Sequence, residues 1–134
     1  MTVTETETAT DREAIAATVQ LYVDSASKGD AEKLREGFHD SAWMYGAIGD
    51  QRFDMPISQM IEIVTGQPLD ADGAYRARIT SIEQVGHAAT ATLEEEGCWG
   101  NLAFTDFFNL QKIDRTWKIV NKSFVHTGGE MPAG

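Results

Sequence analysis

Residues 104–126 read FTDFFNLQKIDRTWKIVNKSFVH, and this stretch says more about the fold than any other. Apolar and polar side chains alternate on both sides of a turn signal, a pattern typical of two antiparallel strands joined as a hairpin. A three-residue loop at Ile113-Asp114-Arg115 would place Asp106 directly opposite Lys122. Cross-strand neighbours on one face have Cβ atoms about 4.5–5.5 Å apart, so this register predicts an ion pair between the two side chains.

Two more long strands precede this hairpin, and three helices precede the strands. The helices are indicated by apolar residues at helical spacing and by cap signals, and the strands by a period of two. Helices first and antiparallel strands afterwards predict an α+β domain, with the helices packed on one face of a curved, mostly antiparallel sheet. The expected helices begin at Thr10, Asp30 and Pro56, and the expected long strands cover residues 74–85, 89–99, 102–112 and 116–126.

One domain over residues 11–127 is expected, with a disordered tail over 1–10 and a flexible tail over 128–134. The formal charge of −10 would be repelled by nucleic acid and by an anionic membrane, so neither is expected as a partner. A single cysteine, Cys98, and the absence of a signal-peptide pattern favour a cytoplasmic location. No apolar run approaches the ~20 residues of a membrane span.

Two segments resemble the nuclear-transport-factor-2-like (NTF2-like) superfamily: YVDSASKGDAEKLREGFHDSAWMYG at residues 22–46, and the hairpin above. The chain is most similar to a bacterial, SnoaL-like branch described as putative lumazine-binding, over about residues 12–127. This resemblance implies a cone-shaped α+β barrel around an apolar cavity that is open at one end. It also implies a homodimer through the outer face of the sheet, where Trp117 and Ile119 would face the partner.

Two enzymes of that superfamily suggest which polar groups face the cavity. Similarity to ketosteroid isomerases aligns Tyr22 with their oxyanion-binding tyrosine, but it places Gly46 where they carry a catalytic base. Similarity to scytalone dehydratase aligns Asp106 with a cavity asparagine and brings Tyr75 near a pocket histidine. The same comparison implies that alternate hairpin residues face inward, namely Phe104, Asp106, Phe108 and Leu110 on one strand and Lys122, Phe124 and His126 on the next.

The candidate catalytic residues are Asp106, His39, His126 and Tyr22. Asp106 would be a base or hydrogen-bond acceptor, with His39 or His126 as its partner and Tyr22 or Tyr75 as a hydroxyl donor. Each has a structural alternative: Asp106 can form a purely architectural ion pair, and Tyr22 can belong to the core. His39 can fix the turn after the second helix. The candidate substrate-binding residues are Tyr75, Met44, Ile61, Phe104, Phe108, Lys122, Phe124, Glu96 and Cys98.

The residues around Gly46 can be divided by strand parity. If Gly46 and Met44 face the cavity, Trp43 and Tyr45 point away from it. The scattered histidines lack the spacing of a metal site, and no cofactor motif is present in the sequence, so neither group is expected.

The expected function is binding of a small, apolar or aromatic molecule in an enclosed cavity, with cofactor-free acid–base chemistry of dehydratase, isomerase or cyclase type. The enzyme would then be a lyase or an isomerase. The alternative is a non-catalytic small-molecule-binding or dimerisation module, in which the Asp106–Lys122 pair is structural.

Overall fold

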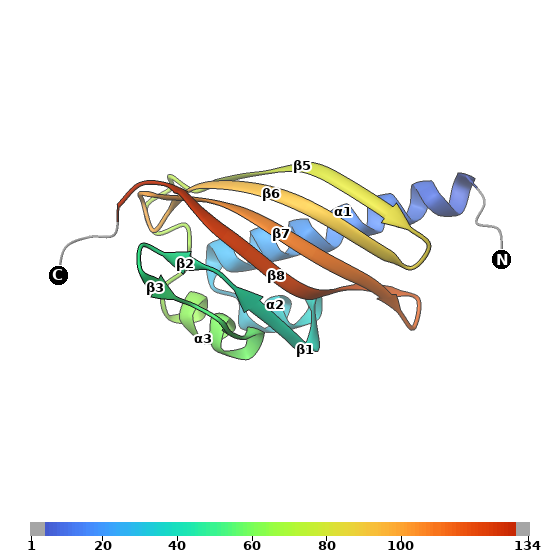
Figure 1. The fold of residues 1–134 in the computed structure, drawn as a ribbon, viewed down its shortest axis with the longest axis horizontal. Coiled ribbons are helices and arrows are strands. Elements are labelled where there is room, and N and C mark those ends of the chain that lie inside the picture. The colour runs from blue at the N-terminus through green and yellow to red at the C-terminus, as the bar shows by residue number, and fades with distance from the viewer. Residues whose placement is uncertain (1–4, 131–134) are drawn as a thin grey trace.

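A computed structural model describes residues 5–130 of the chain. These residues form three helices and a six-stranded sheet, whose strands lie in the order β4-β1-β8-β7-β6-β5 (Figure 1). Strands β2 and β3 form a separate two-stranded ribbon. The elements are α1 (Glu5–Lys28), α2 (Ala31–Gly37), β1 (Phe38–Tyr45), β2 (Ala47–Ile48), β3 (Gln51–Arg52), β4 (Met55–Pro56), α3 (Ile57–Gly66), β5 (Arg76–Val85), β6 (Ala88–Cys98), β7 (Leu102–Ile113) and β8 (Thr116–Gly128).

The sheet is built mainly from one antiparallel meander. Strands β5, β6, β7 and β8 follow one another as hairpins, and β4 pairs antiparallel with β1. Only the pairing of β1 with β8 is parallel among the described strands. The predicted α+β fold, with three helices on a curved, mostly antiparallel sheet, is therefore confirmed.

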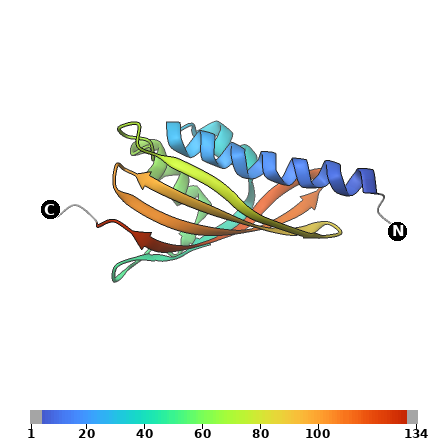
Figure 2. The ribbon, with the colours of Figure 1, turned by 90° about the horizontal axis from the view of Figure 1, so that it is seen from above.

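The helices pack on one face of the sheet because they carry apolar stripes. In α1, Ile15, Val19, Tyr22 and Ala26 recur every three or four residues, and all are buried. The Tyr22 ring meets the Phe108 ring of β7 at a centroid distance of 5.3 Å, in the middle of the sheet. Figure 2 shows α1 running along the sheet, with α2 and α3 gathered at one of its ends. No helix within residues 5–130 is long and apolar enough to cross a membrane.

The start of α1 differs from the prediction. The helix begins at Glu5 and continues through Thr10, so Thr10 does not begin it and residues 5–10 are not an unstructured tail. The first half of the helix is fastened to the β7–β8 hairpin by Asp11, which is buried. Its Oδ1 accepts hydrogen bonds from Lys112 Nζ at 2.8 Å and from the Trp117 indole at 3.2 Å. The other residues of the expected tails, 1–4 and 131–134, lie outside the described residues.

The β7–β8 hairpin turns with two residues, where the sequence predicted three. Asp114 and Arg115 have φ angles of 49° and 69°, and Ile113 pairs with Thr116. Positive φ at both central residues matches the twist of the flanking strands, which is why such turns are favoured in two-residue hairpins. This turn alone shifts the register by one residue.

A bulge at Val120 in β8 shifts the register by one more residue. Asp106 therefore lies opposite Phe124, and Lys122 lies opposite Phe108, so the predicted direct pairing of Asp106 with Lys122 is wrong. The two shifts add up to two residues. Because side chains alternate between the two faces with a period of two, the side chains beyond the bulge keep the face that was predicted for them. Asp106 and Lys122 are thus diagonal neighbours on the same face of the sheet.

Trp117 and Ile119 face the helices, and the prediction that they face a partner on the outer side is wrong. Both side chains are buried. Trp117 and Ile119 precede the Val120 bulge and Lys122 follows it. The bulge reverses the alternation of faces, so all three side chains reach the inner face although 117 and 119 are odd positions and 122 is an even one. Trp43 and Tyr45 point away from the core, as predicted. The exposed apolar side chains of β1, β7 and β8 are Trp43, Tyr45, Phe107 and Val125.

Candidate functional site

A cavity of about 550 Å³ lies between the helices and the inner face of the sheet. Its inner end is formed by the buried residues Tyr22, Glu95, Asp106 and Lys122. Gln67, Ala71 and Asn101 are exposed and line it toward solvent. The remaining wall is mainly apolar and comprises Met44, Ile48, Phe53, Met60, Ile63, Val64, Pro68, Leu69, Cys98, Trp99, Leu102, Phe104 and Phe124.

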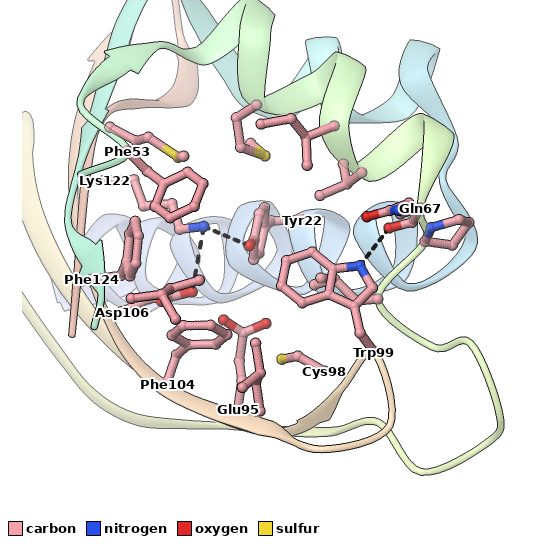
Figure 3. A pocket seen from close by; sticks show the side chains of 18 of the residues that line it. Tyr22, Phe53, Gln67, Glu95, Cys98, Trp99, Phe104, Asp106, Lys122 and Phe124 are labelled. Atoms are coloured by element: carbon pink, nitrogen blue, oxygen red, sulfur yellow. Dashed lines mark hydrogen bonds and ion pairs between the residues drawn. The ribbon is translucent and has the colours of Figure 1, made fainter. Parts of the chain in front are cut away.

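Lys122 is the cation of the cavity wall. Its Nζ donates a hydrogen bond to Tyr22 Oη at 2.8 Å and lies 3.9 Å from Asp106 Oδ2, as the dashed lines in Figure 3 show. The side chains of Lys122 and Asp106 are 9% and 1% exposed. Within residues 5–130 Asp106 Oδ2 has no hydrogen-bond partner, because 3.9 Å is too long for a hydrogen bond. The aspartate therefore offers an unused acceptor to a ligand in the cavity.

Glu95 brings a second carboxyl group to the same space. Figure 3 shows it below the Lys122 amine, beside Asp106 and Cys98. The Tyr75 hydroxyl donates to Glu95 Oε2 at 2.6 Å and holds this side chain in place. Burial first, and then the negative charge of Asp106, raise the pKa of Glu95 well above its usual value. A raised pKa favours the protonated form of Glu95, so this carboxyl group can act as a proton donor.

Tyr22 is a neutral hydroxyl group directed at the cavity. Burial first, and then the charge of Glu95, raise the pKa of Tyr22 well above its usual value. Its oxygen accepts the hydrogen bond from Lys122, which leaves its own proton available. The inner end of the cavity thus combines a carboxylate acceptor, a protonated carboxyl group, an ammonium group and a free hydroxyl donor.

Glu95 was missed by the sequence reasoning, which favoured Glu96 and Cys98 as cavity residues. Cys98 lines the cavity, whereas Glu96 is exposed on the outside. The reason is a register shift between Glu95 and Cys98, at Gly97, which has φ +68°. A Cβ on Gly97 would overlap the Ala74 carbonyl group, so only glycine fits this bulge.

Trp99, also missed, closes one side of the cavity. It follows the Gly97 bulge and has φ 52°, and its indole N–H donates to the Gln67 carbonyl oxygen at 2.7 Å. This bond joins the end of β6 to the end of α3 (Figure 3). The Trp99 ring also meets Phe104 edge-on at 6.5 Å. Such an aromatic wall is typical of a site that takes a flat, apolar ligand.

The other residues proposed from the sequence divide into two groups. Those that line the cavity are Tyr22, Met44, Cys98, Phe104, Asp106, Lys122 and Phe124. Ile61 and Phe108 are buried in the core behind the wall, and Tyr75 lies one hydrogen bond away, behind Glu95.

The two candidate catalytic histidines do not line the cavity. His39 lies in β1, where its Nδ1 accepts a hydrogen bond from the Ser41 N–H at 3.1 Å and contacts Ser41 Oγ at 2.8 Å. His126 Nε2 donates to the Gly128 carbonyl oxygen at 2.7 Å. Both rings therefore serve local backbone structure, which was the structural alternative for His39. Asp106 has Lys122, Tyr22 and Glu95 as neighbours instead of a histidine.

Gly46 adjoins the cavity wall, but no side chain can replace it. A Cβ at this position would lie 2.5 Å from the Phe124 ring. Gly46 aligns with the catalytic base of ketosteroid isomerases, and the space that a side chain would need at this position is therefore filled by an aromatic ring. Among residues 5–130, no cluster of His, Cys, Asp and Glu side chains has the arrangement of a metal site.

Comparison with known proteins agrees with this architecture. A family profile described as "putative lumazine-binding" matches residues 10–125. The chain belongs to this family. It is also 28% identical over 117 residues to a protein named "Aldolase FrzH" from Cladobotryum sp., covering 87% of this chain and 92% of that one.

Solved structures place the family in the NTF2-like superfamily. An NTF2-like protein of unknown function from Methylobacillus flagellatus is 34% identical, with a TM-score of 0.79, over 87% of this chain and 92% of that one. Another from Shewanella baltica is 25% identical, with a TM-score of 0.79, over 98% of this chain and all of that one. A ketosteroid isomerase-like protein from Erwinia carotovora, 14% identical with a TM-score of 0.64 over 85% and 94% of the two chains, shares the fold alone.

Proposed function

We propose that this protein binds a small, largely apolar carbonyl compound and carries out cofactor-free acid–base chemistry on it, as a lyase or an isomerase. The observation that carries the proposal is the pair of buried carboxyl groups, Asp106 and Glu95, at the inner end of an apolar cavity. A general base and a general acid are needed together in such reactions, and two carboxyl groups with different proton affinities can supply both.

Asp106 is the base in this proposal. Asp106 lines the cavity, and its Oδ2 has no hydrogen-bond partner among residues 5–130, so this carboxylate can accept a proton from a carbon next to the carbonyl group. Lys122, 3.9 Å away, balances the negative charge of Asp106 in the ground state. The wall around these groups is mainly apolar, and fixed charges act more strongly on a reacting anion in such surroundings than in water.

Glu95 and Tyr22 serve the oxygen atom that becomes negative. The raised pKa of Glu95 keeps a proton on its carboxyl group, so it can donate that proton to an enolate or an alkoxide. The free hydroxyl proton of Tyr22 can hold the same oxygen by a hydrogen bond. Proton removal at one atom and proton delivery at another are the steps of isomerisation, dehydration and aldol-type cleavage.

The relatives support this class of chemistry to different degrees. The protein named an aldolase points to a lyase that acts on carbonyl compounds, but the two chains are only 28% identical. The family description, putative lumazine-binding, supports the alternative of a small-molecule-binding protein without catalysis. In that alternative the Asp106–Lys122 pair would be structural, and the cavity would hold an unreacted ligand.

The experiment is proton exchange on a ketone probe. The α-hydrogens of 1-tetralone, a bicyclic ketone, are followed by NMR in D2O with and without the protein. Exchange should be faster with the wild type, and Asp106→Asn should slow it by about 10²–10⁴-fold, the usual contribution of a general base. Glu95→Gln should slow it as well. Glu94→Gln is the matched control, because Glu94 is the exposed neighbour of Glu95 and pairs with Arg78 on the surface.

Two outcomes would contradict the proposal in different ways. Exchange no faster than in buffer, with tetralone bound, would favour the non-catalytic alternative. Exchange that is unchanged in Asp106→Asn would show that another group is the base. Binding itself is followed by the fluorescence of Trp99, which is the tryptophan on the cavity wall.

The protein also has the surface expected of a homodimer, and we include a second copy among its proposed partners. Trp43 and Tyr45 stack on the outer face of the sheet with ring centroids 6.2 Å apart. Phe107 and Val125 are each about half exposed on neighbouring strands. Contiguous exposed aromatic and aliphatic groups of this kind mark an interaction site.

A further inference from the structure

We propose that Lys122 is a nucleophile, whose amine condenses with an aldehyde or ketone in the cavity to form an imine. The inference rests on the proposed small-molecule site, but it adds a covalent step that acid–base chemistry alone does not require. Amines of lysine are the usual protein partners of carbonyl groups in covalent catalysis, above all where they lie in an apolar pocket.

The surroundings of Lys122 distinguish it from the other lysines of the chain. Lys28 and Lys33 are exposed. Lys112 is 26% exposed and bound to Asp11, and Lys118, which is half-buried, donates through its Nζ to the Glu36 carbonyl oxygen. Lys122 alone borders the cavity, where its Nζ lies 4.9 Å from the centre of the Tyr22 ring and 5.5 Å from that of Phe124. A carbonyl compound that enters the cavity meets this amine at the inner end.

A proton acceptor lies next to the amine. An ammonium group must lose a proton before its nitrogen can attack a carbonyl carbon. Asp106 Oδ2 lies 3.9 Å away and has no hydrogen-bond partner within residues 5–130. The nitrogen lone pair then forms the C–N bond, and the C=O electron pair moves to oxygen. Tyr22, already in contact with the amine, can hold that oxygen while the new C–N nitrogen, which now carries two protons and a positive charge, passes one proton to it and gives a neutral carbinolamine.

Loss of water needs a proton donor, and Glu95 is placed for this step. It borders the cavity beside Asp106 and carries a proton of its own. Protonation of the carbinolamine oxygen lets it leave as water, while the nitrogen lone pair forms the C=N bond. In sum, one carbonyl compound and the Lys122 ammonium group give one protonated imine and one water molecule, while Asp106 has gained one proton and Glu95 has lost one. No oxidant, reductant or cofactor enters the balance.

The cavity also indicates which carbonyl compounds would react. Phe53, Phe104, Phe124 and Trp99 surround the space in front of Lys122 (Figure 3), so an aromatic or polycyclic body is favoured. The negative charge of Asp106 opposes a ligand that carries its own carboxylate next to the carbonyl group. The expected class is therefore uncharged aromatic or alicyclic aldehydes and ketones.

The test is reductive trapping of the wild-type protein with 2-naphthaldehyde and sodium cyanoborohydride, with modified lysines located by peptide mass spectrometry. Lys122 should be labelled at least about tenfold faster than Lys28 and Lys33, because a bound aldehyde has a high effective concentration at the amine. Glyoxylate, a small aldehyde with a carboxylate, should lose this preference for Lys122. Lys122→Arg keeps the positive charge and should show no adduct in the cavity.

Labelling confined to Lys28 and Lys33, with Lys122 unmodified, would overturn the proposal. Trp99 fluorescence of Lys122→Arg, measured with 2-naphthaldehyde, then decides whether the proposed binding site is refuted together with the imine. A change in fluorescence shows that the site still binds the aldehyde, and no change shows that it does not. Tetralone exchange separates the two mechanisms further. If exchange persists in Lys122→Arg, Asp106 acts directly on the ketone, whereas a loss of exchange together with trapping at Lys122 places the imine on the reaction path.

Discussion

Replacement of Lys122 by Met removes the sole cation among the described residues that line the cavity. The two side chains have similar length and shape, so the change acts mainly through charge. Asp106, 1% exposed, is left without its counter-charge at 3.9 Å. Breaking a buried ion pair from one side typically costs about 3–5 kcal/mol, so Lys122→Met should lower the free energy of unfolding by about that amount near pH 8.

The cost should depend on pH, because Glu95 can take up a proton. At present Lys122 lowers the pKa of Glu95 while burial and Asp106 raise it, so removal of the lysine raises the pKa further. A carboxyl group with a folded-state pKa above its unfolded value of about 4.3 stabilises the protein below that value. This stability is lost as the pH rises toward the folded-state pKa, by up to about 1.4 kcal/mol per pH unit. Removal of the lysine should thus cost more above the folded-state pKa of Glu95 in the wild type than below it, where Glu95 is protonated in both proteins.

Urea unfolding followed by circular dichroism at pH 4.5, 6 and 8 measures this difference between variant and wild type. Lys33→Met is the control, because Lys33 is exposed and its loss should cost little at any pH. The double variant Asp106→Leu/Lys122→Met should be close to wild-type stability, since no charge is left without a partner. A penalty below about 1 kcal/mol, or one that does not change with pH, would refute the view that these charges form one coupled buried group.

Three further results are expected. Asp11→Ala should cost about 1–3 kcal/mol through the lost hydrogen bonds to Lys112 and the hairpin, as measured by urea unfolding. Lys112 holds the pKa of Asp11 below its usual value, so the wild type should lose this contribution as the pH falls through that lowered pKa, and the variant should have none to lose. Phe107→Glu should turn a dimer into a monomer in size-exclusion chromatography with light scattering, whereas the same change at the exposed Val85 should not. Binding of 2-naphthaldehyde should change tryptophan fluorescence in the wild type but not in Trp99→Phe.

The fold was predictable because its main signals are local. Alternation along β5 to β8 and helical spacing in α1 and α3 each indicate one apolar face of the element. These apolar faces are buried by packing against each other. The second helix begins after Asp30, whose side chain accepts from the Lys33 N–H, as a cap signal predicts. The predicted start of α1 was wrong, because the helix begins at Glu5 and the capping box at Thr10 lies inside it. The contacts of Asp11 with the distant hairpin were also not visible in any local pattern.

The hairpin register shows how a correct face can follow from a wrong pairing. A three-residue loop was expected between β7 and β8, but the turn has two residues, which alone would have sent Lys122 to the outer face. The bulge at Val120 brings it back. Trp117, which precedes the bulge, was therefore assigned to the wrong side, while Lys122, which follows it, was assigned to the right one.

The candidate site depends on two interruptions of strand alternation, and this is why its polar residues were harder to predict than its walls. Glu95 and Cys98 differ in parity, yet both line the cavity because the Gly97 bulge lies between them. Lys122 reaches the same cavity across the Val120 bulge. In a strand that alternates without interruption, charged side chains are expected on the solvent face. A charged side chain becomes buried only where it takes an inward position in the alternation or where a bulge turns it inward. The glycine within EEEGCW is a usable signal of this kind, because glycine inside a strand often marks a bulge, and it would have pointed to Glu95 in place of Glu96.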